Sequence, residues 1–346
     1  MQIVHILAAR PNFIKAAPLI SELDNRGHNN IIIHTNQHYD YKMSEIFFNN
    51  LHIPAPDYHL GIQSGTHGEQ TGYGIIEIEK VLKDVTPQLV IVYGDVNSTL
   101  SGAIAAVKLH IPIYHIESGC RSGDMTMPEE VNRIMIDSIS TKLFCTELSA
   151  YNNVRNQDAY VVGNTAIDTL HSIQYNLNNI PGNYYLCTLH RPFNVDDVNR
   201  LEKILERLNR LDELVIVPAH PRLEKNIRYK TKYNNIKFIE PLGYIDFISY
   251  INSSKGVITD SGGVQCESAF LRKPLLTLRD STEHIITLSF GNTLCDINDI
   301  NKNTFKIDTD KPLPKIWDGN ASKRIADILD ESFSNRSSRF NWQSFM

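Results

Sequence analysis

The most constraining feature of this sequence is a pair of apolar runs separated by a helix-forming segment. Residues 90–93 (VIVY) are continuously apolar, as is typical of a strand buried on both faces of a parallel sheet, and residues 111–116 form a second such run. Small side chains at residues 98–108 predict a helix between them. Because parallel strands need a crossover of this kind, the stretch predicts an α/β fold with a parallel sheet.

Acidic side chains follow both apolar runs. Asp95 comes after the first strand and a glycine, Glu117 ends the second strand, and Glu129 follows the proline that opens the next helix. Open α/β sheets bind ligands at the carboxyl ends of their strands. Three carboxylates gathered there predict acid/base chemistry on a neutral or anionic substrate.

Length and composition describe a soluble globular protein. The 346 residues are enough for one large or two ordinary domains, and 42% of them are hydrophobic. A net charge of -5 argues against a dedicated binder of nucleic acid or of acidic membranes. Five cysteines without a CxxC pair favour reduced thiols in a cytoplasmic protein over disulfides or a metal site. The chain has no run of 18 apolar residues, so we expect no transmembrane helix.

The alternation of strands and helices predicts two Rossmann-like domains, 1–166 and 167–346. The first would carry the acid/base carboxylates, and the second would include the last helix, near residues 321–329, and a weakly ordered tail from Ser332. Strands are expected at residues 3–7, 30–34, 90–93, 111–116, 142–145, 184–189, 214–217, 237–239, 256–259 and 275–278, with a short one near 160.

Two cations lie where the first strand turns into its helix. Arg10 and Lys15 flank the expected helix start, and the N-terminus of a helix attracts anions through its free N–H groups and its dipole. The pair therefore indicates an anion site. The alternative is that both are ordinary solvated surface charges.

A second phosphate-type turn follows the expected strand at 256–259. Ser261, Gly262 and Gly263 open a helix there, and glycines allow backbone N–H groups to approach a phosphate. Glu267 lies about one helical turn further, where it would meet a ribose hydroxyl pair. Together they favour a bound nucleotide diphosphate, although an ordinary tight turn with a surface glutamate would have the same sequence.

Several common cofactor motifs are absent. No GxGxxG follows the first strand, which counts against a tightly bound NAD or FAD, and no GxxxxGK[ST] indicates a P-loop. Neither HExxH nor a cysteine ligand pair suggests a metal. One histidine is notable, because His190 follows a strand and precedes Arg191, and a cation there would balance the charge of a phosphate leaving group. The alternative is a structural loop histidine.

Taken together, these short patterns resemble one family, the non-hydrolysing UDP-N-acetylglucosamine 2-epimerases. Each pattern is weak alone, but all occur in the family's order. They are Arg10-Pro11 with Ile14-Lys15, Gln37-His38, Gly94-Asp95 with Ser98-Thr99, His115-Ile116-Glu117 with Gly119 and Arg121-Ser122, Pro128-Glu129-Glu130 with Asn132-Arg133, Gly163-Asn164-Thr165, His190-Arg191, Asp260-Ser261-Gly262-Gly263 with Gln265 and Glu267, and Arg279-Asp280 with Thr282-Glu283.

The resemblance implies a glycosyltransferase-B-like fold of two Rossmann-like domains facing a cleft. It also implies the reaction: removal of the proton at C2 of the sugar with anti elimination of UDP, a bound glycal, and re-addition of UDP to give the C2 epimer for surface polysaccharide. No redox cofactor or metal is needed. A cytoplasmic homodimer is the family-based expectation for location and assembly.

The resemblance also implies roles for individual residues. The acid/base carboxylates would be Asp95, Glu117 and Glu129. Groups facing the phosphates would be His190 with Arg10 and Lys15, while Arg133 would support the sugar. The turn of Ser261, Gly262 and Gly263 would hold phosphate, and Glu267 the ribose.

Some positions depart from the family pattern and leave the substrate open. His284-Ile285 stands where many members have Arg-Pro after Thr-Glu. The same departure occurs in relatives that act on UDP-2,3-diacetamido-2,3-dideoxy-glucuronate. The sequence is also similar to those relatives at Gly65-Thr66-His67-Gly68 and at Asn97. Three further hypotheses fit the same motifs: a hydrolysing 2-epimerase that releases N-acetylmannosamine and UDP, a glycosyltransferase, and a non-catalytic nucleotide-sugar-binding protein.

Overall fold

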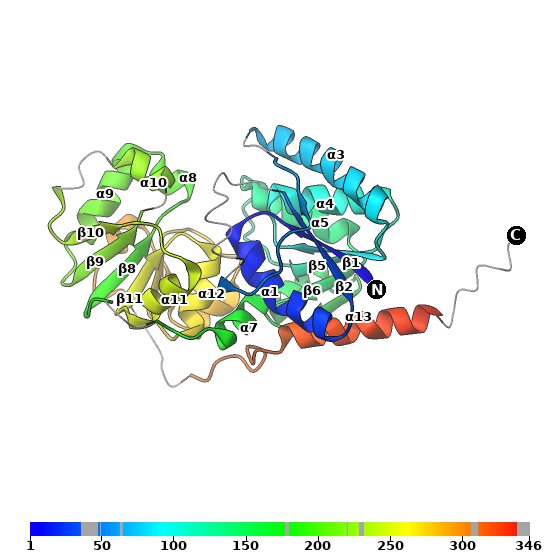
Figure 1. The fold of residues 1–346 in the computed structure, drawn as a ribbon. Coiled ribbons are helices and arrows are strands. Elements are labelled where there is room, and N and C mark those ends of the chain that lie inside the picture. Colours follow the sequence, from blue (N-terminus) through cyan, green and yellow to red (C-terminus); the bar gives the residue numbers. More distant parts are fainter. Residues whose placement is uncertain are drawn as a thin grey trace, which may run out of the picture. The chain divides into compact units, whose positions relative to one another are not determined.

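The chain folds into two compact α/β units. The computed structural model describes residues 1–35, 48, 50–62, 65–176, 180–219, 221–227, 232–305 and 311–337. Unit 1 comprises Met1–Cys120, Met125–Ser172 and Lys315–Met346, and unit 2 comprises Arg121–Asp124 and Ile173–Pro314 (Figure 1). Each unit contains its own parallel sheet with helices, which confirms the expected fold class.

In the described part of unit 1, seven parallel strands form one sheet in the order β3-β2-β1-β4-β5-β6-β7. β1 pairs with β2 on one side and with β4 on the other, so the chain order reverses between β1 and β4. Ligands of doubly wound sheets bind at such a switch point. The strands are β1 (Gln2–Leu7), β2 (Asn29–His34), β3 (Tyr58–His59), β4 (Leu89–Tyr93), β5 (Ile113–Ser118), β6 (Lys142–Cys145) and β7 (Ala159–Val161).

Helices cover both faces of this sheet. One layer contains α3 (His67–Val85), α4 (Asn97–Lys108) and α5 (Pro128–Ile139), and the other contains α1 (Arg10–Asn25), α7 (Thr165–Ser172) and α13 (Ala321–Ser337) (Figure 1). The short helix α6 (Leu148–Val154) contacts β6 and β7. The central strands are fully buried because both faces are covered, which explains their unbroken apolar sequences.

The last helix belongs with the first sheet, which corrects the predicted division at residues 166/167. Asp168 in α7 accepts hydrogen bonds from the backbone N–H groups of Ala321 (3.1 Å) and Ser322 (2.7 Å), so it caps α13. Arg26 forms ion pairs with Asp327 (2.7 Å) and Asp330 (2.9 Å) of the same helix. The chain therefore returns to unit 1 after unit 2 is complete.

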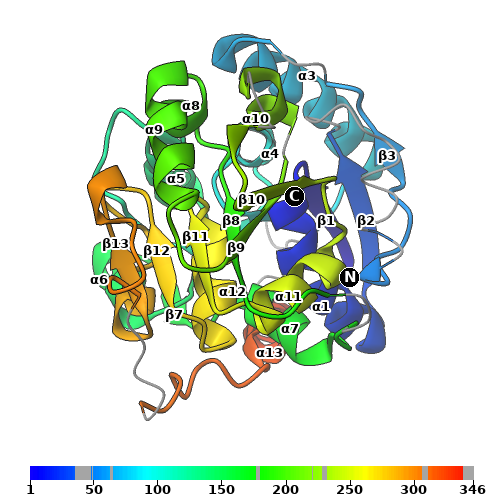
Figure 2. The same cartoon turned by 90° about the vertical axis from the view of Figure 1, so that its left-hand side faces the viewer.

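The described part of unit 2 contains a six-stranded parallel sheet in the order β10-β9-β8-β11-β12-β13. Its switch point lies between β8 and β11, in the same relation to its chain order as in unit 1. Figure 2 shows the strands of this sheet with α8 and α9 close to them. The strands are β8 (Tyr184–Thr188), β9 (Leu214–Pro218), β10 (Ile236–Ile239), β11 (Gly256–Thr259), β12 (Leu275–Thr277) and β13 (Asn292–Leu294).

The helices of unit 2 begin where the sequence provides start signals. The carboxylate of Asp197 accepts hydrogen bonds from the N–H groups of Asn199 and Arg200, so Asp197 is the N-cap of α9. The described helices of this unit are α8 (Pro192–Val195), α9 (Val198–Leu208), α10 (Pro221–Asn226), α11 (Tyr244–Ser253) and α12 (Gly262–Phe270), with 3-10 turns at Ile285–Ser289 and Ile297–Asp299.

A few expected boundaries differ from the structure. The helix α3 starts at His67, because Thr66 caps it and Glu69 closes a capping box with Thr66. The short strands β3 and β13 were not predicted, since two or three residues carry no periodic signal. The tail expected from Ser332 is helical as far as Ser337.

Other expectations concern residues outside the described ranges. They are most of the helix near residues 43–49, the Gln37-His38 pair, and the chain after Ser337. Among the helices that the structure describes, none combines the length and the apolar character needed to cross a membrane.

Candidate active site

The loop after β4 brings Asp95 to the switch point of unit 1. Gly94 adopts a left-handed conformation (φ +65°), and a Cβ there would lie 3.1 Å from Lys15 Nζ. The buried side chain of Asn12 in α1 donates a hydrogen bond to the Tyr93 carbonyl (2.8 Å). These contacts tie the end of β4 to the start of α1, the helix that carries Lys15.

Glu117 lies in a strained conformation at the end of β5. Its φ of +67° is rare for a residue with a side chain, and the pairing of β5 with β6 shifts between Ile116 and Ser118. Backbone strain of this kind persists where the surrounding structure holds it and is concentrated at functional sites. The Glu117 carboxylate therefore bulges out of the strand and faces α1.

Lys15 and Glu117 form an ion pair with an Nζ–Oε1 distance of 2.6 Å. Burial alone would lower the pKa of Lys15, but the carboxylates of Glu117 and Asp95 raise it above its ordinary value. The amine is therefore a fixed positive charge beside both acids. The structure places Lys15 among carboxylates, whereas the sequence suggested a separate anion site with Arg10, which is the first residue of α1.

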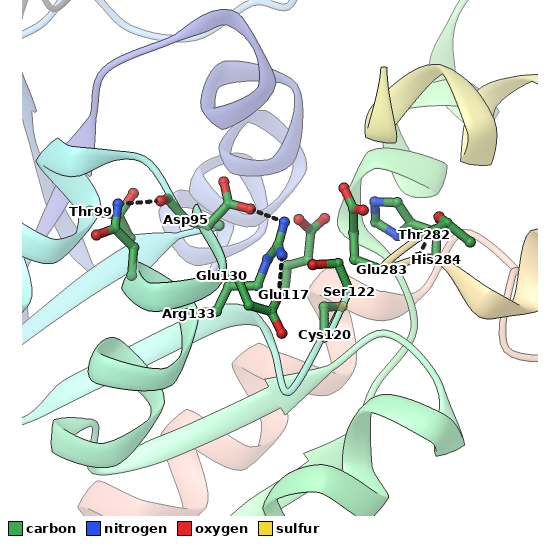
Figure 3. A network of polar contacts seen from close by, with 12 residues as sticks. Asp95, Thr99, Glu117, Cys120, Ser122, Glu130, Arg133, Thr282, Glu283 and His284 are labelled. Carbon is green, nitrogen blue, oxygen red and sulfur yellow. Dashed lines mark hydrogen bonds and ion pairs between the residues drawn. The ribbon is translucent and has the colours of Figure 1, made fainter. Parts of the chain in front are cut away.

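Arg133 links Asp95 to a carboxylate that the sequence analysis did not select. Its guanidinium contacts Asp95 Oδ2 at 2.5 Å and Glu130 Oε2 at 2.7 Å (Figure 3). Arg133 and Glu130 are both buried, whereas the predicted acid Glu129 is half-buried in the same first turn of α5. From the sequence alone, either glutamate of this adjacent pair could face the interior. In the structure the buried one is Glu130.

A second polar network surrounds the same loop. Asn132 Nδ2 donates to the Asp95 carbonyl (2.8 Å) and contacts Asn97 Oδ1 (3.2 Å). Asn97 in turn contacts the His67 ring, and its Nδ2 donates to Gln70 Oε1 (2.8 Å). The start of α3 is therefore connected to the backbone of Asp95, which gives the His67 and Asn97 positions noted in the sequence a structural connection to the acids.

In unit 2, His190 is held by the buried Asp260 at the switch point between β8 and β11. Asp260 Oδ1 lies 2.9 Å from His190 Nδ1, and its carboxylate also accepts hydrogen bonds from the N–H groups of His190 and Arg191 and from Asn194 Nδ2. Burial would raise the pKa of Asp260, but His190 and these donors hold it below its usual range. Asp260 is therefore an anion that orients His190.

The predicted phosphate turn opens α12. Ser261 is the N-cap, and Gly262 and Gly263 form the first turn. A Cβ on Gly262 would lie 2.4 Å from Glu283 Oε1, so a larger residue there would displace that buried carboxylate. Glu283 is itself paired with Arg279 at 2.7 Å. The turn therefore lies against Glu283, whose counter-charge is Arg279.

Glu267, predicted to bind ribose, is buried one turn further along α12. It faces Tyr244, the first residue of α11. The pKa of the Tyr244 hydroxyl is raised well above its usual value, first by burial and then by the negative charge of Glu267. A carboxylate held beside a hydroxyl in this way is suited to accept hydrogen bonds from a polar ligand.

The structure therefore brings the predicted residues together in two groups. Unit 1 gathers Asp95, Glu117, Lys15 and Arg133. Unit 2 gathers Ser261, Gly262, Gly263 and Glu267 at and along the start of α12, with His190 in the loop that follows β8, the strand next to β11. Within the described residues there is no cluster of histidine, cysteine and acidic side chains that could hold a metal ion.

Comparison with known proteins links this arrangement to one family. Residues 21–330 match the family model described as UDP-N-acetylglucosamine 2-epimerase. A UDP-N-acetylglucosamine 2-epimerase homolog from Methanococcus maripaludis is 40% identical over 95% of this chain and 99% of its own length. The UDP-N-acetylglucosamine 2-epimerase of Methanocaldococcus jannaschii and the UDP-2,3-diacetamido-2,3-dideoxy-D-glucuronate 2-epimerase of Pseudomonas aeruginosa are each 42% identical over 84% of this chain and 87% of their own lengths.

Solved structures agree with these matches. The crystal structure of the Methanocaldococcus jannaschii UDP-GlcNAc 2-epimerase in complex with UDP-GlcNAc and UDP has a TM-score of 0.88 at 39% identity, covering 96% of this chain and all of that chain. The calicheamicin glycosyltransferase CalG4 has a TM-score of 0.53 at 13% identity and covers 95% of this chain and 97% of its own, which shows a likeness of fold alone.

Proposed function

This chain belongs to the UDP-N-acetylglucosamine 2-epimerase family, and we propose that it inverts C2 of UDP-N-acetylglucosamine without releasing free sugar. The family match supports an isomerase that acts on a nucleotide sugar. The observation that carries the proposed mechanism is the pair of acids at the switch point of unit 1. Asp95 is held by Arg133 and Glu117 by Lys15, so both carboxylates have a fixed position and a fixed counter-charge.

The proposed reaction is an elimination followed by an addition. The C2 proton passes to a carboxylate of the group Asp95, Glu117 and Glu129, and the C2–H electron pair forms the C1–C2 double bond as the C1–O bond to UDP breaks. Return of a proton to the opposite face of C2 and of UDP to C1 gives the epimer. Because C2–H is weakly acidic, the step requires both a well-placed base and stabilisation of the departing UDP.

Unit 2 would hold the leaving group. The Ser261-Gly262-Gly263 turn opens α12 and offers N–H donors to phosphate, and His190 is oriented by Asp260 for the same charge. Glu267 would accept hydrogen bonds from the ribose hydroxyls. Arg10 and Lys15 were expected to face phosphate, and the ion pair with Glu117 supports assigning Lys15 to the proton-transfer group instead.

A second candidate substrate is UDP-2,3-diacetamido-2,3-dideoxy-glucuronate. The Pseudomonas relative with that name is as similar to this chain as the Methanocaldococcus epimerase. In addition, the network from His67 through Asn97 and Asn132 to the Asp95 backbone connects the start of α3 to the acids. Polar groups at that place would meet a substituent on the carbon next to C2.

The test is to incubate the enzyme with a panel of UDP-sugars in deuterated water and to follow C2 by NMR. Solvent deuterium at C2 of a sugar that remains attached to UDP supports the proposal. Stoichiometric release of UDP would instead show a hydrolysing enzyme, and an absence of exchange with every sugar would contradict the epimerase assignment. Family resemblance also supports a homodimer, which light scattering of the eluted protein tests.

Asp95→Asn and Glu117→Gln should each abolish this exchange while UDP binding remains measurable, because each removes an acid but leaves unit 2 intact. A suitable control is Asp158→Asn, since Asp158 also pairs with a cation, Lys142, but lies before β7 and away from the carboxyl ends of the strands. The control variant should exchange deuterium at the wild-type rate. Normal exchange by either site variant would remove that residue from the mechanism.

A further inference from the structure

A fully buried pair, His115 and Asp137, lies behind the two acids of unit 1. His115 Nδ1 is 2.7 Å from Asp137 Oδ1, and the two side chains are 0% and 1% exposed. His115 belongs to β5 and Asp137 to α5. A buried titratable pair lowers stability unless its remaining polar atoms are satisfied. The other two polar atoms of this pair have partners at the ends of the strands.

The outer atoms of the pair contact two different loops. His115 Nε2 donates a hydrogen bond to the Gly94 carbonyl (2.8 Å), because a carbonyl oxygen can only accept. Asp137 Oδ2 accepts a hydrogen bond from the Gly119 N–H (3.1 Å). Gly94 immediately precedes Asp95, and Gly119 follows Glu117 by two residues. The pair therefore forms a continuous link between the loops that carry the two acids.

Both loops have backbone conformations that need such support. Gly94, Glu117 and Gly119 all have positive φ, at +65°, +67° and +74°. A left-handed conformation at Glu117 is unfavourable and persists when its surroundings hold it. The loop at Gly119 is also tightly packed, since a Cβ there would lie 2.3 Å from the Ala150 carbonyl oxygen. Hydrogen bonds at Gly94 and Gly119 hold the backbone on either side of the acids.

We infer that His115 and Asp137 are positioning residues, which keep the Asp95 and Glu117 carboxylates in their relative places for transfer of the C2 proton. This inference rests on the proposed function. Proton transfer depends on heavy-atom distances of about 3 Å. A displacement of about 1 Å is enough to cost on the order of 100-fold in rate.

The neighbouring histidine His5 provides a matched control. It is equally buried in β1 and also has two side-chain partners, the Tyr93 hydroxyl at 2.7 Å and Asn30 Oδ1 at 2.8 Å. Neither partner belongs to the loops after β4 and β5. A His5 variant therefore measures the general effect of removing a buried, doubly hydrogen-bonded histidine from this sheet. Any additional effect of a His115 variant comes from loss of the link between the acid loops.

The experiment compares His115→Leu, His115→Gln, Asp137→Leu and His5→Gln in the C2 deuterium exchange assay. For His115→Leu we expect kcat to fall by about 100-fold with KM within about threefold of wild type, because substrate binding does not depend on the relative placement of the acids. His115→Gln should recover part of the loss, about tenfold, since its amide can still donate to the Gly94 carbonyl. His5→Gln should keep kcat within about threefold of wild type.

Two kinetic outcomes would overturn the inference: a kcat of His115→Leu close to wild type, or an equal loss in His5→Gln. If His115→Leu does not fold, Asp137→Leu decides in its place, because it keeps a branched side chain but removes both the acceptor for the imidazole and the acceptor for the Gly119 N–H. Its kcat should then fall with KM retained, and an unchanged kcat would reject the positioning role.

Hydrogen–deuterium exchange of the backbone separates this inference from the proposed function. Peptides that cover residues 94–97 and 117–120 should both exchange faster in His115→Leu than in wild type, and should be unchanged in His5→Gln. If the wild-type enzyme exchanges deuterium into no UDP-sugar, the proposed function fails and the amide measurement alone decides. Unchanged protection of both peptides in His115→Leu would then refute the link.

Discussion

At the residue scale, each acid of the candidate site has a defined partner. Glu117 is held by Lys15, Asp95 by Arg133, and the Arg133 guanidinium is itself held by Glu130. Such pairs preserve the charge of buried carboxylates, because an opposite charge within about 4 Å offsets the penalty of burial. The sequence predicted Asp95 and Glu117 from their places after strands. It did not identify Glu130, since only the direction of α5 relative to the sheet distinguishes Glu130 from Glu129.

The same scale yields a prediction for the Asp260 and His190 pair. Asp260→Asn replaces one carboxylate oxygen by an amide group, which cannot accept hydrogen bonds from the N–H donors around it. The imidazole of His190 would then no longer be held in its orientation by a carboxylate. We expect kcat/KM for the proposed exchange to fall by about 10- to 100-fold. A double-mutant cycle with His190→Ala checks the cause. The two losses should not add if Asp260 acts through His190, whereas full additivity would contradict that role.

At the scale of single elements, the structure explains why the strand predictions were reliable. Strands buried on both faces, such as β4, must be apolar throughout, and that pattern is visible in any short window of sequence. Helix starts were less accurate where side-chain capping decides them. At α3, for example, the helix starts at His67 because the Thr66 hydroxyl and Glu69 satisfy the first N–H groups.

A pH dependence follows from the buried histidine of β1. Burial lowers the pKa of His5 from 6.5 to about 4, although the Asn30 hydrogen bond and the Asp24 charge act in the opposite direction. The unfolded chain therefore binds a proton that the folded chain does not between these values. The contribution of a neutral His5 to the free energy of unfolding is therefore complete above pH 6.5. It is lost as the pH falls toward 4, and the total loss is about 3 kcal/mol.

Urea unfolding at several pH values measures this effect. The free energy of unfolding of wild type should fall more steeply between pH 6.5 and 4.5 than that of His5→Gln, which has no proton to bind at this position. The comparison between the two proteins removes the contribution of the carboxylates, which is common to both. Parallel curves for wild type and variant would show that His5 is not the group responsible.

At the scale of the whole molecule, the chain leaves unit 1, builds unit 2 and returns to finish the first. The return is secured by charges, since Arg26 contacts Glu22, Asp327 and Asp330, and His28 contacts Asp330. The contacts with Asp327 and Asp330 join residues 301 to 304 positions apart. From the sequence alone the last helix is expected in the second domain, because the pattern of an amphipathic helix shows that one face is buried but does not show against which sheet or helices it packs.

Arg26→Ala should lower the free energy of unfolding by about 1–2 kcal/mol, because one half-buried guanidinium serves three carboxylates. Arg222→Ala is the control. Arg222 also pairs with a carboxylate, Asp196, but both side chains are about half exposed, so the expected loss is below about 0.5 kcal/mol. Equal effects in thermal or urea unfolding would show that α13 does not depend on this cluster.

The sequence by itself determined most of the strands, the two parallel sheets, the family and the places of two acids at the ends of β4 and β5. These follow from patterns of a few residues, or from short motifs that occur along the chain in the family's order. Only the tertiary structure decided that Lys15 pairs with Glu117, that the buried Glu130 pairs with Arg133, that α13 joins unit 1 and that His115 and Asp137 link the two acid loops. Lys15 and Glu117 are 102 positions apart. A contact of that kind depends on which strands become neighbours in the sheet, and the local pattern of apolar residues does not show the strand order.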